Sequence, residues 1–226
     1  MRRIVIEAHP GRPAPIRIAL LPGAYQHPED FERAGFAAAV RSRGLAIDLE
    51  FIAIDFAHML DRSGLDALRR EYVAPARQSG CREIWLGGAS LGAYFALVYA
   101  DQQPGDLDGL CLLAPYLGNR VVTGEIAQAG GVHAWQPSSI AADDEERRIW
   151  ALIRRLPSEQ LRVHLGQGRQ DRFGHGHGML ADALPEGASD LVDGGHDWAT
   201  WLRLWELFLD RFAKPVAAPA PRPGVC

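Results

Sequence analysis

The chain has 226 residues, and 47% of them are hydrophobic, which is enough for one substantial core and suggests a single domain. Its formal charge of -4 comes from 24 basic and 28 acidic residues without a long run of either sign, so neither nucleic acid nor an anionic lipid surface is an expected partner. The first apolar run is interrupted at Glu7, and no later segment approaches the roughly 18 continuous apolar residues of a membrane span. We therefore expect a soluble, cytoplasmic protein of unknown oligomeric state.

Three cysteines are present, an odd number without metal-ligand spacing. Cys81 and Cys111 lie in or beside apolar runs, and Cys226 ends the chain. We expect reduced, structural thiols.

Short runs rich in Val, Ile and Leu alternate with amphipathic stretches along the chain. This alternation predicts an α/β fold, doubly wound, with a mainly parallel sheet and helices on both faces. The predicted elements, in chain order, are strands 3–7 and 16–21, helix 28–43, strand 47–54, helix 64–79, strand 83–87, helix 92–102, strand 109–114, helix 143–155, strand 161–166, helix 173–184, strand 189–192 and helix 198–213. Ligands are expected at the carboxyl ends of such strands.

Two segments depart from this alternation. Residues 117–157 are more than one crossover connection needs, so this segment is a candidate small lid within a single domain at 1–213. Residues 214–226 are rich in Pro and Ala, and we expect a disordered tail.

The stretch Gly88-Ala89-Ser90-Leu91-Gly92 matches the pattern G-x-S-x-G between a predicted strand and a predicted helix. Such a strand-to-helix turn exposes the central serine hydroxyl, and glycines on either side remove Cβ atoms that would clash. The pattern alone is a moderate signal, and the alternative for Ser90 is a small residue of a helix N-terminal turn. The setting between strand and helix favours a nucleophile.

A nucleophilic serine requires a base and an acid that orients the base. In this architecture the chain order is Ser, Asp or Glu, then His, with both partners in loops after later strands. Asp171 follows one predicted strand and His196 follows the last one. The alternatives are a turn residue or a partner of Arg172 for Asp171, and a helix-entry residue for His196; Asp193 is the second candidate acid.

The second oxyanion donor is expected in the loop after an early strand. The first donor is the amide of Leu91, at the N-terminus of the helix that follows Ser90. The loop Pro22-Gly23-Ala24-Tyr25 supplies the second: Gly23 permits close approach of the backbone, with the amide of Ala24 the first choice and that of Tyr25 the next.

The motifs LLPGAY, GGASLG, GQGRQD and GGHDW together resemble the α/β-hydrolase superfamily over nearly the whole chain, and the last resembles the histidine loop of serine esterases, in which Gly-His-x-Trp is common. The resemblance implies a Ser90, Asp171, His196 triad and acyl transfer in two steps through an acyl-enzyme. Two departures stand out. Pro22-Gly23 replaces the His-Gly of many members, and the short N-terminal part implies that the leading strands of the eight-stranded sheet are reduced.

Other residues have two interpretations each. Tyr116, His133 and Trp135 are candidates to line a substrate pocket or to pack ordinarily, and Trp198 belongs to a core stripe yet is close enough to His196 to shape the pocket. Two further histidines, His175 and His177, have a spacing that can bind metal, but no cysteine or carboxylate cluster completes a site, which favours a mobile loop that enters a helix. Asp197 is interpreted as a cap for the Trp-rich helix.

Together these features predict a cofactor-free serine hydrolase without a metal, which cleaves a small-molecule carboxylic ester of a small or medium acyl group. An acyl thioester is the nearest alternative substrate because the same machinery cleaves it. A binding module that retains the fold with an inert triad is the alternative from a different class.

Overall fold

The computed structural model of the protein describes residues 1–53 and 63–213. The tail predicted at 214–226, which includes Cys226, lies outside the described residues, as does the last residue of the strand predicted at 47–54. Within the described part, Cys81 and Cys111 are buried free thiols.

The described strands form one seven-stranded sheet in the order β1-β3-β2-β4-β5-β6-β7. Only β1 pairs antiparallel among these strands, with β3, and it lies at the edge. The central strands β3, β4 and β5 are buried on nearly every residue, as expected for apolar runs covered on both faces. The strands are β1 (Arg3–Ile6), β2 (Ile16–Leu21), β3 (Ile47–Ile52), β4 (Glu83–Ala89), β5 (Gly109–Leu113), β6 (Arg162–Gly168) and β7 (Ser189–Val192).

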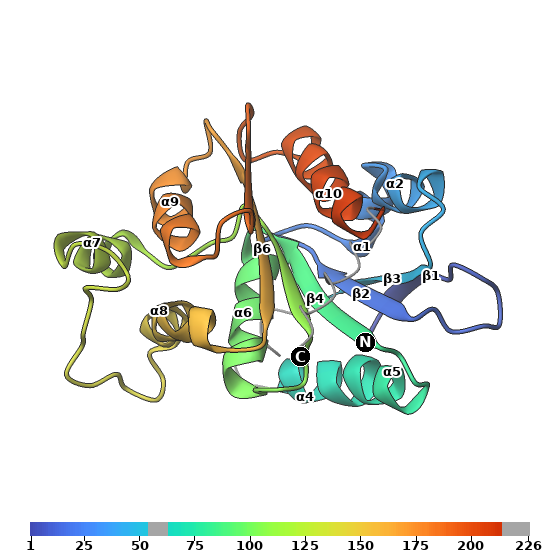
Figure 1. Ribbon diagram of the computed structural model, residues 1–226, viewed down its shortest axis with the longest axis horizontal. Coiled ribbons are helices and arrows are strands. Elements are labelled where there is room, and N and C mark those ends of the chain that lie inside the picture. The colour runs from blue at the N-terminus through green and yellow to red at the C-terminus, as the bar shows by residue number, and fades with distance from the viewer. Residues whose placement is uncertain (54–62, 214–226) are drawn as a thin grey trace, which may run out of the picture.

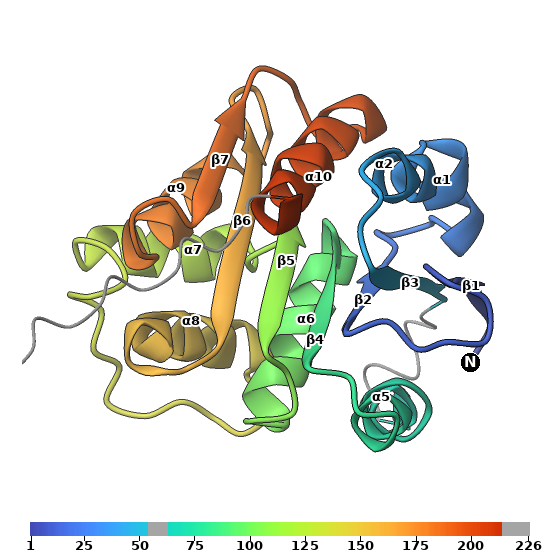
Figure 2. The same ribbon diagram turned by 45° about the vertical axis from the view of Figure 1, so that its right-hand side comes forward.

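Helices cover both faces of the sheet, and the predicted doubly wound α/β class is confirmed (Figures 1 and 2). One face carries α1 (Pro28–Arg33), α2 (Phe36–Ser42) and α10 (Trp198–Ala213). The opposite face carries α4 (Ser63–Leu68), α5 (Ala74–Gln78), α6 (Leu91–Gln102), α8 (Glu145–Arg155) and α9 (Gly174–Ala183). Trp201 and Trp205 of α10 are buried between this helix and the sheet. The prediction that the tryptophans of this helix form a core stripe is confirmed for these two residues.

The helices of the structure differ from the predicted ones at three places. The helix predicted at 28–43 is two helices, because Gly35 adopts φ 97, which a continuous helix does not allow. The helix predicted at 64–79 contains a π-helical turn at Arg69–Val73, between α4 and α5. A further helix, α7 (Arg120–Gln128), was not predicted; Asn119 caps it by accepting hydrogen bonds from the amides of Val121 and Val122.

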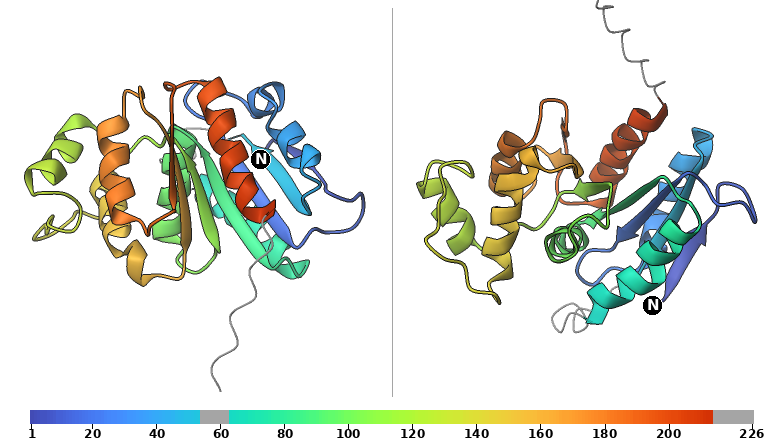
Figure 3. Two further views of the ribbon diagram at one scale, coloured as in Figure 1. Left: turned by 45° about the horizontal axis from the view of Figure 1, so that its top comes forward. Right: turned by 60° about the horizontal axis from the view of Figure 1, so that its bottom comes forward.

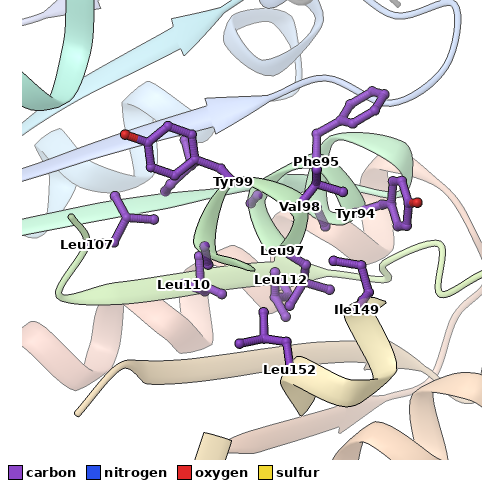
Figure 4. Close-up of a cluster of buried hydrophobic side chains, with 14 of the residues drawn as sticks. Tyr94, Phe95, Leu97, Val98, Tyr99, Leu107, Leu110, Leu112, Ile149 and Leu152 are labelled. Atoms are coloured by element: carbon purple, nitrogen blue, oxygen red, sulfur yellow. The ribbon is translucent and has the colours of Figure 1, made fainter. Parts of the chain in front are cut away.

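The segment 117–157, expected as a small lid, ends in a helix of the core. The apolar face of α8 packs against α6 and β5, where Ile149 and Leu152 lie beside Leu97 and Leu112 (Figure 4). Arg148 of α8 also forms an ion pair with Asp101 of α6. Because α8 belongs to the helical layer, only the part of this segment before α8 stays a candidate lid.

Helices α7 and α9 lie beside each other at the end of the molecule opposite to α1 and α2 (Figures 1 and 3). This end is where β6 and β7 extend the sheet. No helix in the described ranges has the length and apolar character to cross a membrane.

Candidate active site

Ser90 lies in the turn between β4 and α6, at the carboxyl edge of the sheet. Its φ of 54 and ψ of -116 are strained for a residue with a side chain. A Cβ atom at Gly88 would lie 2.3 Å from the carbonyl oxygen of Leu21, and one at Gly92 would lie 1.9 Å from the same atom. Only glycine fits at these two positions, so the predicted reason for the glycines of G-x-S-x-G is confirmed.

Ser90, His196 and Asp171 meet at this edge from three separate loops. Nε2 of His196 lies 2.8 Å from Oγ of Ser90, and Nδ1 of the same ring lies 2.8 Å from Oδ2 of Asp171. With its proton on Nδ1, the imidazole donates to the carboxylate and accepts from the serine hydroxyl. The structure thus brings together the three residues that the sequence analysis selects.

The acid loop and the histidine loop are paired with each other through their backbones. The amide of Arg169 donates to the carbonyl of Val192, and that of Gln170 donates to the carbonyl of Gly194, at 2.8 and 2.9 Å. The Gly194 amide returns a hydrogen bond to the Gln170 side chain. A Cβ atom at Gly168 would lie 2.5 Å from the Gly194 carbonyl, so this close pairing requires glycine there. The pairing fixes the position of Asp171 relative to His196.

The surroundings of Asp171 favour its ionised form. Burial opposes the charge, but hydrogen bonds from His196 and from the amide of Phe173 outweigh burial and hold the pKa of Asp171 below its ordinary value. The rings of Phe173 and Trp201 meet the imidazole edge-on, with centroids 5.1 and 5.0 Å away. The histidine is therefore held by one hydrogen bond to a carboxylate and by aromatic contacts.

The other acids near the base have different partners. Asp193, the second candidate acid, has a side chain that is 80% exposed and pairs with Arg169. The Asp197 carboxylate accepts a hydrogen bond from the amide of Thr200 in the first turn of α10, so its interpretation as a helix cap is confirmed. Its hydrogen bond to this amide lowers the pKa of Asp197. Nδ1 of His196 is instead engaged by Asp171.

Three amides close to Ser90 have no hydrogen-bond partner among the described residues: those of Leu91, Ala24 and Tyr25. The amide of Gly23, by contrast, donates to the side chain of Gln26. A Cβ atom at Gly23 would lie only 3.3 Å from Cβ of Ser90, so this loop and the serine are in close approach. The loop can therefore aim a free amide at the space next to Oγ.

Two hollows flank this arrangement. The large cleft has a volume of about 1120 Å³, and its lining includes Gly23, Ala24, Leu91, Phe95 and Leu68. Its wall also carries positively and negatively charged residues: Arg2, Arg70, Asp66 and Glu71. The small hollow, of about 430 Å³, is lined by Tyr116, Arg120, Thr123, Arg172, Phe173 and His175. Ser90 and His196 do not themselves line either hollow, but each hollow includes a residue beside them: Leu91 follows Ser90 in the chain, and the ring of Phe173 contacts His196.

The structure assigns different surroundings to the four predicted pocket residues. Tyr116 lines the small hollow. Trp135 is only 3% exposed and its indole donates to Glu125, so the interpretation of Trp135 as a pocket residue is corrected to a core residue. His133 is exposed and lines neither of the two hollows.

Trp198 is partly buried and packs edge-on against Phe31 and Phe36. The indole that contacts His196 belongs to Trp201 instead. Trp198 is linked to the site through Trp201, whose ring it meets at a centroid distance of 5.0 Å.

His175 and His177 lie in the first turns of α9, not in a mobile loop before it, which corrects that expectation. Nε2 of the fully buried His177 lies 2.9 Å from the carbonyl oxygen of Pro115, so this nitrogen carries the proton that the contact needs. His175 is exposed and lines the small hollow. No group of three His, Cys, Asp or Glu residues suited to a metal ion occurs within 1–53 and 63–213.

Sequence reasoning did not select Phe173, Trp201 or Gln170. Phe173 and Gln170 contact the histidine loop from the loop after β6, which is distant in sequence, and Trp201 packs against His196 from the first turn of α10. The position of Phe173, two residues after Asp171, was the one available signal.

No protein-family model matches the chain, and no curated protein matches its sequence. Similar solved structures exist. The Staphylococcus aureus fluorophosphonate-binding serine hydrolase FphF, with substrate bound, has a TM-score of 0.67 at 13% identity, over 94% of this chain and 92% of that chain. The S. aureus S-formylglutathione hydrolase FrmB has a TM-score of 0.60 at 13% identity, over 90% and 82% of the two chains.

Est1E from Butyrivibrio proteoclasticus, with ferulic acid bound, has a TM-score of 0.61 at 14% identity, over 94% of this chain and 96% of that chain. These likenesses cover nearly the whole of the described sheet and its helices. The chain has the α/β-hydrolase fold.

Proposed function

We propose that this protein is a serine hydrolase that cleaves a carboxylic ester through an acyl-enzyme. The observation that carries the proposal is the continuous chain of hydrogen bonds from Ser90 through His196 to Asp171, with the serine in a strained turn. The fold shared with solved serine hydrolases and esterases supports it.

In the first step Oγ of Ser90 attacks the acyl carbonyl carbon while Nε2 of His196 takes the hydroxyl proton. The resulting oxyanion accepts hydrogen bonds from the free amide of Leu91 and from that of Ala24, with Tyr25 the alternative second donor. The tetrahedral intermediate collapses, and the imidazolium gives its proton to the departing alkoxide. Ionised Asp171 stabilises the imidazolium throughout.

In the second step a water molecule attacks the acyl-Ser90 ester. His196 takes a proton from this water and later returns it to Oγ of Ser90. The products are one alcohol and one carboxylic acid, with the enzyme regenerated. No group beyond the side chains and amides named here is needed for either step.

The large cleft supports a substrate with a small or medium apolar substituent. Leu91 and Ala24, the proposed oxyanion donors, are part of its wall, so a substituent of the reacting carbonyl can enter it. Its wall also includes Leu68 and Phe95, which suit an apolar substituent of small or medium size.

Replacement of Ser90 by Ala tests the proposal. With 4-nitrophenyl butyrate as substrate, the variant should lose a factor of about 10^4 or more in kcat, and its unfolding midpoint should stay near that of the wild type. A Ser90→Ala protein with near wild-type turnover would exclude Ser90 as the nucleophile. A folded wild type that hydrolyses no acyl ester or thioester would favour the binding module with an inert triad.

An acyl thioester is the second candidate substrate, because the same steps cleave it and one structural neighbour is named as an S-formylglutathione hydrolase. Matched butyryl esters and butyryl thioesters, compared by kcat/KM, decide between the two. We expect the ester to be preferred; a higher kcat/KM for the thioester would reassign the enzyme as a thioesterase.

A further inference from the structure

The small hollow has one wall residue, Phe173, in contact with His196. The ring of Phe173 lies edge-on to His196, and the ring of Tyr116 lies edge-on to that of Phe173 with centroids 5.7 Å apart. Tyr116 is also tied to the nucleophile, because its amide donates to the carbonyl oxygen of Ser90. Both aromatic residues line the hollow. A substituent of a substrate bound at Ser90 that extends along these two rings therefore enters the hollow.

The charges of this hollow are of one sign. Arg120 and Arg172 line it together with His175, and the residues of its wall include no carboxylate. Among the described residues neither guanidinium forms an ion pair, although most arginines of this chain do. The Arg172 guanidinium lies over the ring of Phe173, 4.9 Å from its centroid, which holds it against the wall.

Two carboxylates near this wall are already engaged. Asp171, next to Arg172, accepts hydrogen bonds from His196 and from the amide of Phe173. The Glu146 carboxylate accepts hydrogen bonds from the Tyr116 hydroxyl at 2.7 Å and from the amide and the side chain of Asn119 at 3.0 and 2.7 Å. Three donors of the wall residues Tyr116 and Asn119 thus engage this carboxylate, and neither arginine forms an ion pair with it.

The local backbone adds little to the positive potential. Helices α7 and α9 both begin at the hollow, with Arg120 at the first position of α7 and Phe173 next to the first position of α9. A helix N-terminus carries a partial positive charge, but Asn119 already caps the amides of Val121 and Val122 in α7. Asp171 likewise accepts from the amide of Phe173 before α9. The two unpaired guanidinium groups are therefore the main positive charge of this concavity.

We propose that the small hollow is a specificity site for an anionic oxygen group, a carboxylate or a phosphate, carried by the substrate. Guanidinium groups bind both anions with paired hydrogen bonds. The proposal rests on the hydrolase function above for its substrate, and the large cleft, with charges of both signs, receives the uncharged part.

The first experiment needs no activity. Wild-type protein and the variants Arg120→Gln and Arg172→Gln are titrated with glutarate and, separately, with inorganic phosphate, and the unfolding midpoint is recorded. The two anions show which oxygen group the site prefers. Each variant should need about tenfold more anion than the wild type for the same stabilisation, the factor typical of one exposed charge-assisted hydrogen bond.

The matched control is Arg82→Gln. Arg82 is an exposed arginine at the amino end of β4, at the opposite edge of the sheet. This variant should titrate like the wild type. Titration curves that are the same for wild type, Arg120→Gln and Arg172→Gln would overturn the site.

The second experiment measures selectivity. The acyl-side ratio is kcat/KM for 4-nitrophenyl hemiglutarate divided by kcat/KM for 4-nitrophenyl valerate. The leaving-group ratio is kcat/KM for 3-carboxy-4-nitrophenyl acetate divided by kcat/KM for 4-nitrophenyl acetate. One of the two ratios should fall about tenfold in Arg120→Gln and in Arg172→Gln, because KM for the carboxylate-bearing ester rises. Arg172→Lys, which keeps the positive charge, should retain most of the wild-type ratio. The ratio should also fall at 1 M salt, where the screening length is about 3 Å.

The failures are distinguishable. Anion binding without a change in either ratio would overturn the assignment of the anion to the substrate. A wild type that binds anions but hydrolyses none of the four esters would contradict the hydrolase, and the titration would still decide the anion site.

Discussion

The imidazole of His196 is fixed by contacts to each of its parts. Its two nitrogens face Asp171 and Ser90 at the same distance of 2.8 Å, and Phe173 and Trp201 meet the ring edge-on. The tautomer that can act as a base depends on the carboxylate, because only an acceptor at Nδ1 keeps the proton there.

Replacement of Asp171 by Asn should therefore lower kcat by about 10^3 to 10^4, because an amide nitrogen at this place favours the wrong tautomer. Steady-state hydrolysis of 4-nitrophenyl butyrate measures the effect. The control is Asp193→Asn, whose side chain is 80% exposed and pairs with Arg169; its kcat should stay within about twofold of the wild type. A larger loss in Asp193→Asn than in Asp171→Asn would reverse the assignment of the acid.

At the scale of elements, the junction of β4 with α6 depends on close backbone contact with β2. The carbonyl oxygen of Leu21 occupies the space where Cβ atoms of Gly88 and Gly92 would be. Helix α6 is buried on nearly all sides, so it has no room to shift away.

Gly92→Ala should consequently lower the free energy of unfolding by at least about 3 kcal/mol, since its Cβ atom would overlap backbone. Chemical denaturation measures this change. Gly178→Ala is the matched control, because Gly178 lies inside α9 and a Cβ atom there would meet nothing within 4 Å. That variant should gain about 0.5 to 1 kcal/mol; an equal loss in both would show that steric overlap at Gly92 is not the cause.

The elements differ in how well sequence predicts them. Strands β2 and β7 were predicted with their observed bounds. For β2 the bounds are clear in the sequence, because its apolar run lies between Pro15 and Pro22. Helix α7 was missed because Val121, Val122 and Thr123 are β-branched and Gly124 interrupts the pattern. The antiparallel direction of β1 is set by pairing with β3, which is not a local property.

The candidate site likewise has parts that were predicted from the sequence and parts that were not. Ser90, Asp171 and His196 were selected because their order and their loops follow from the fold. The two hollows were not foreseen. The small hollow combines residues near Arg120 with residues near Arg172, and the packing of α7 beside α9 brings them together.

At the scale of the whole molecule, the sheet separates two cores, and one of them contains a buried ionisable ring. His164 of β6 is 3% exposed and neither ring nitrogen has a hydrogen-bond partner within the described part of the chain. Burial, and then the charge of Arg211, lower the pKa of His164 to about 4, against the opposing charge of Asp190.

Because the pKa of an unfolded histidine is about 6.5, the unfolded state binds this proton first on acidification. The contribution of His164 to stability is therefore complete above pH 6.5 and is lost as the pH falls toward 4. Between pH 7.5 and pH 5, urea unfolding should show the wild type losing about 2 kcal/mol relative to His164→Leu. His133→Gln, at an exposed position, should follow the wild type; parallel curves for wild type and His164→Leu would contradict the prediction.

The central claim is that Ser90 is a nucleophile activated by His196, and a fluorophosphonate probe tests it most directly. The probe phosphonylates an activated serine with loss of fluoride, and mass spectrometry of the intact protein and its peptides locates the adduct. We predict one adduct on wild-type protein, located at Ser90, none on Ser90→Ala, and labelling slowed by about 10^3 or more in His196→Ala. Folded wild-type protein that stays unlabelled, or an adduct on another residue, would contradict the claim.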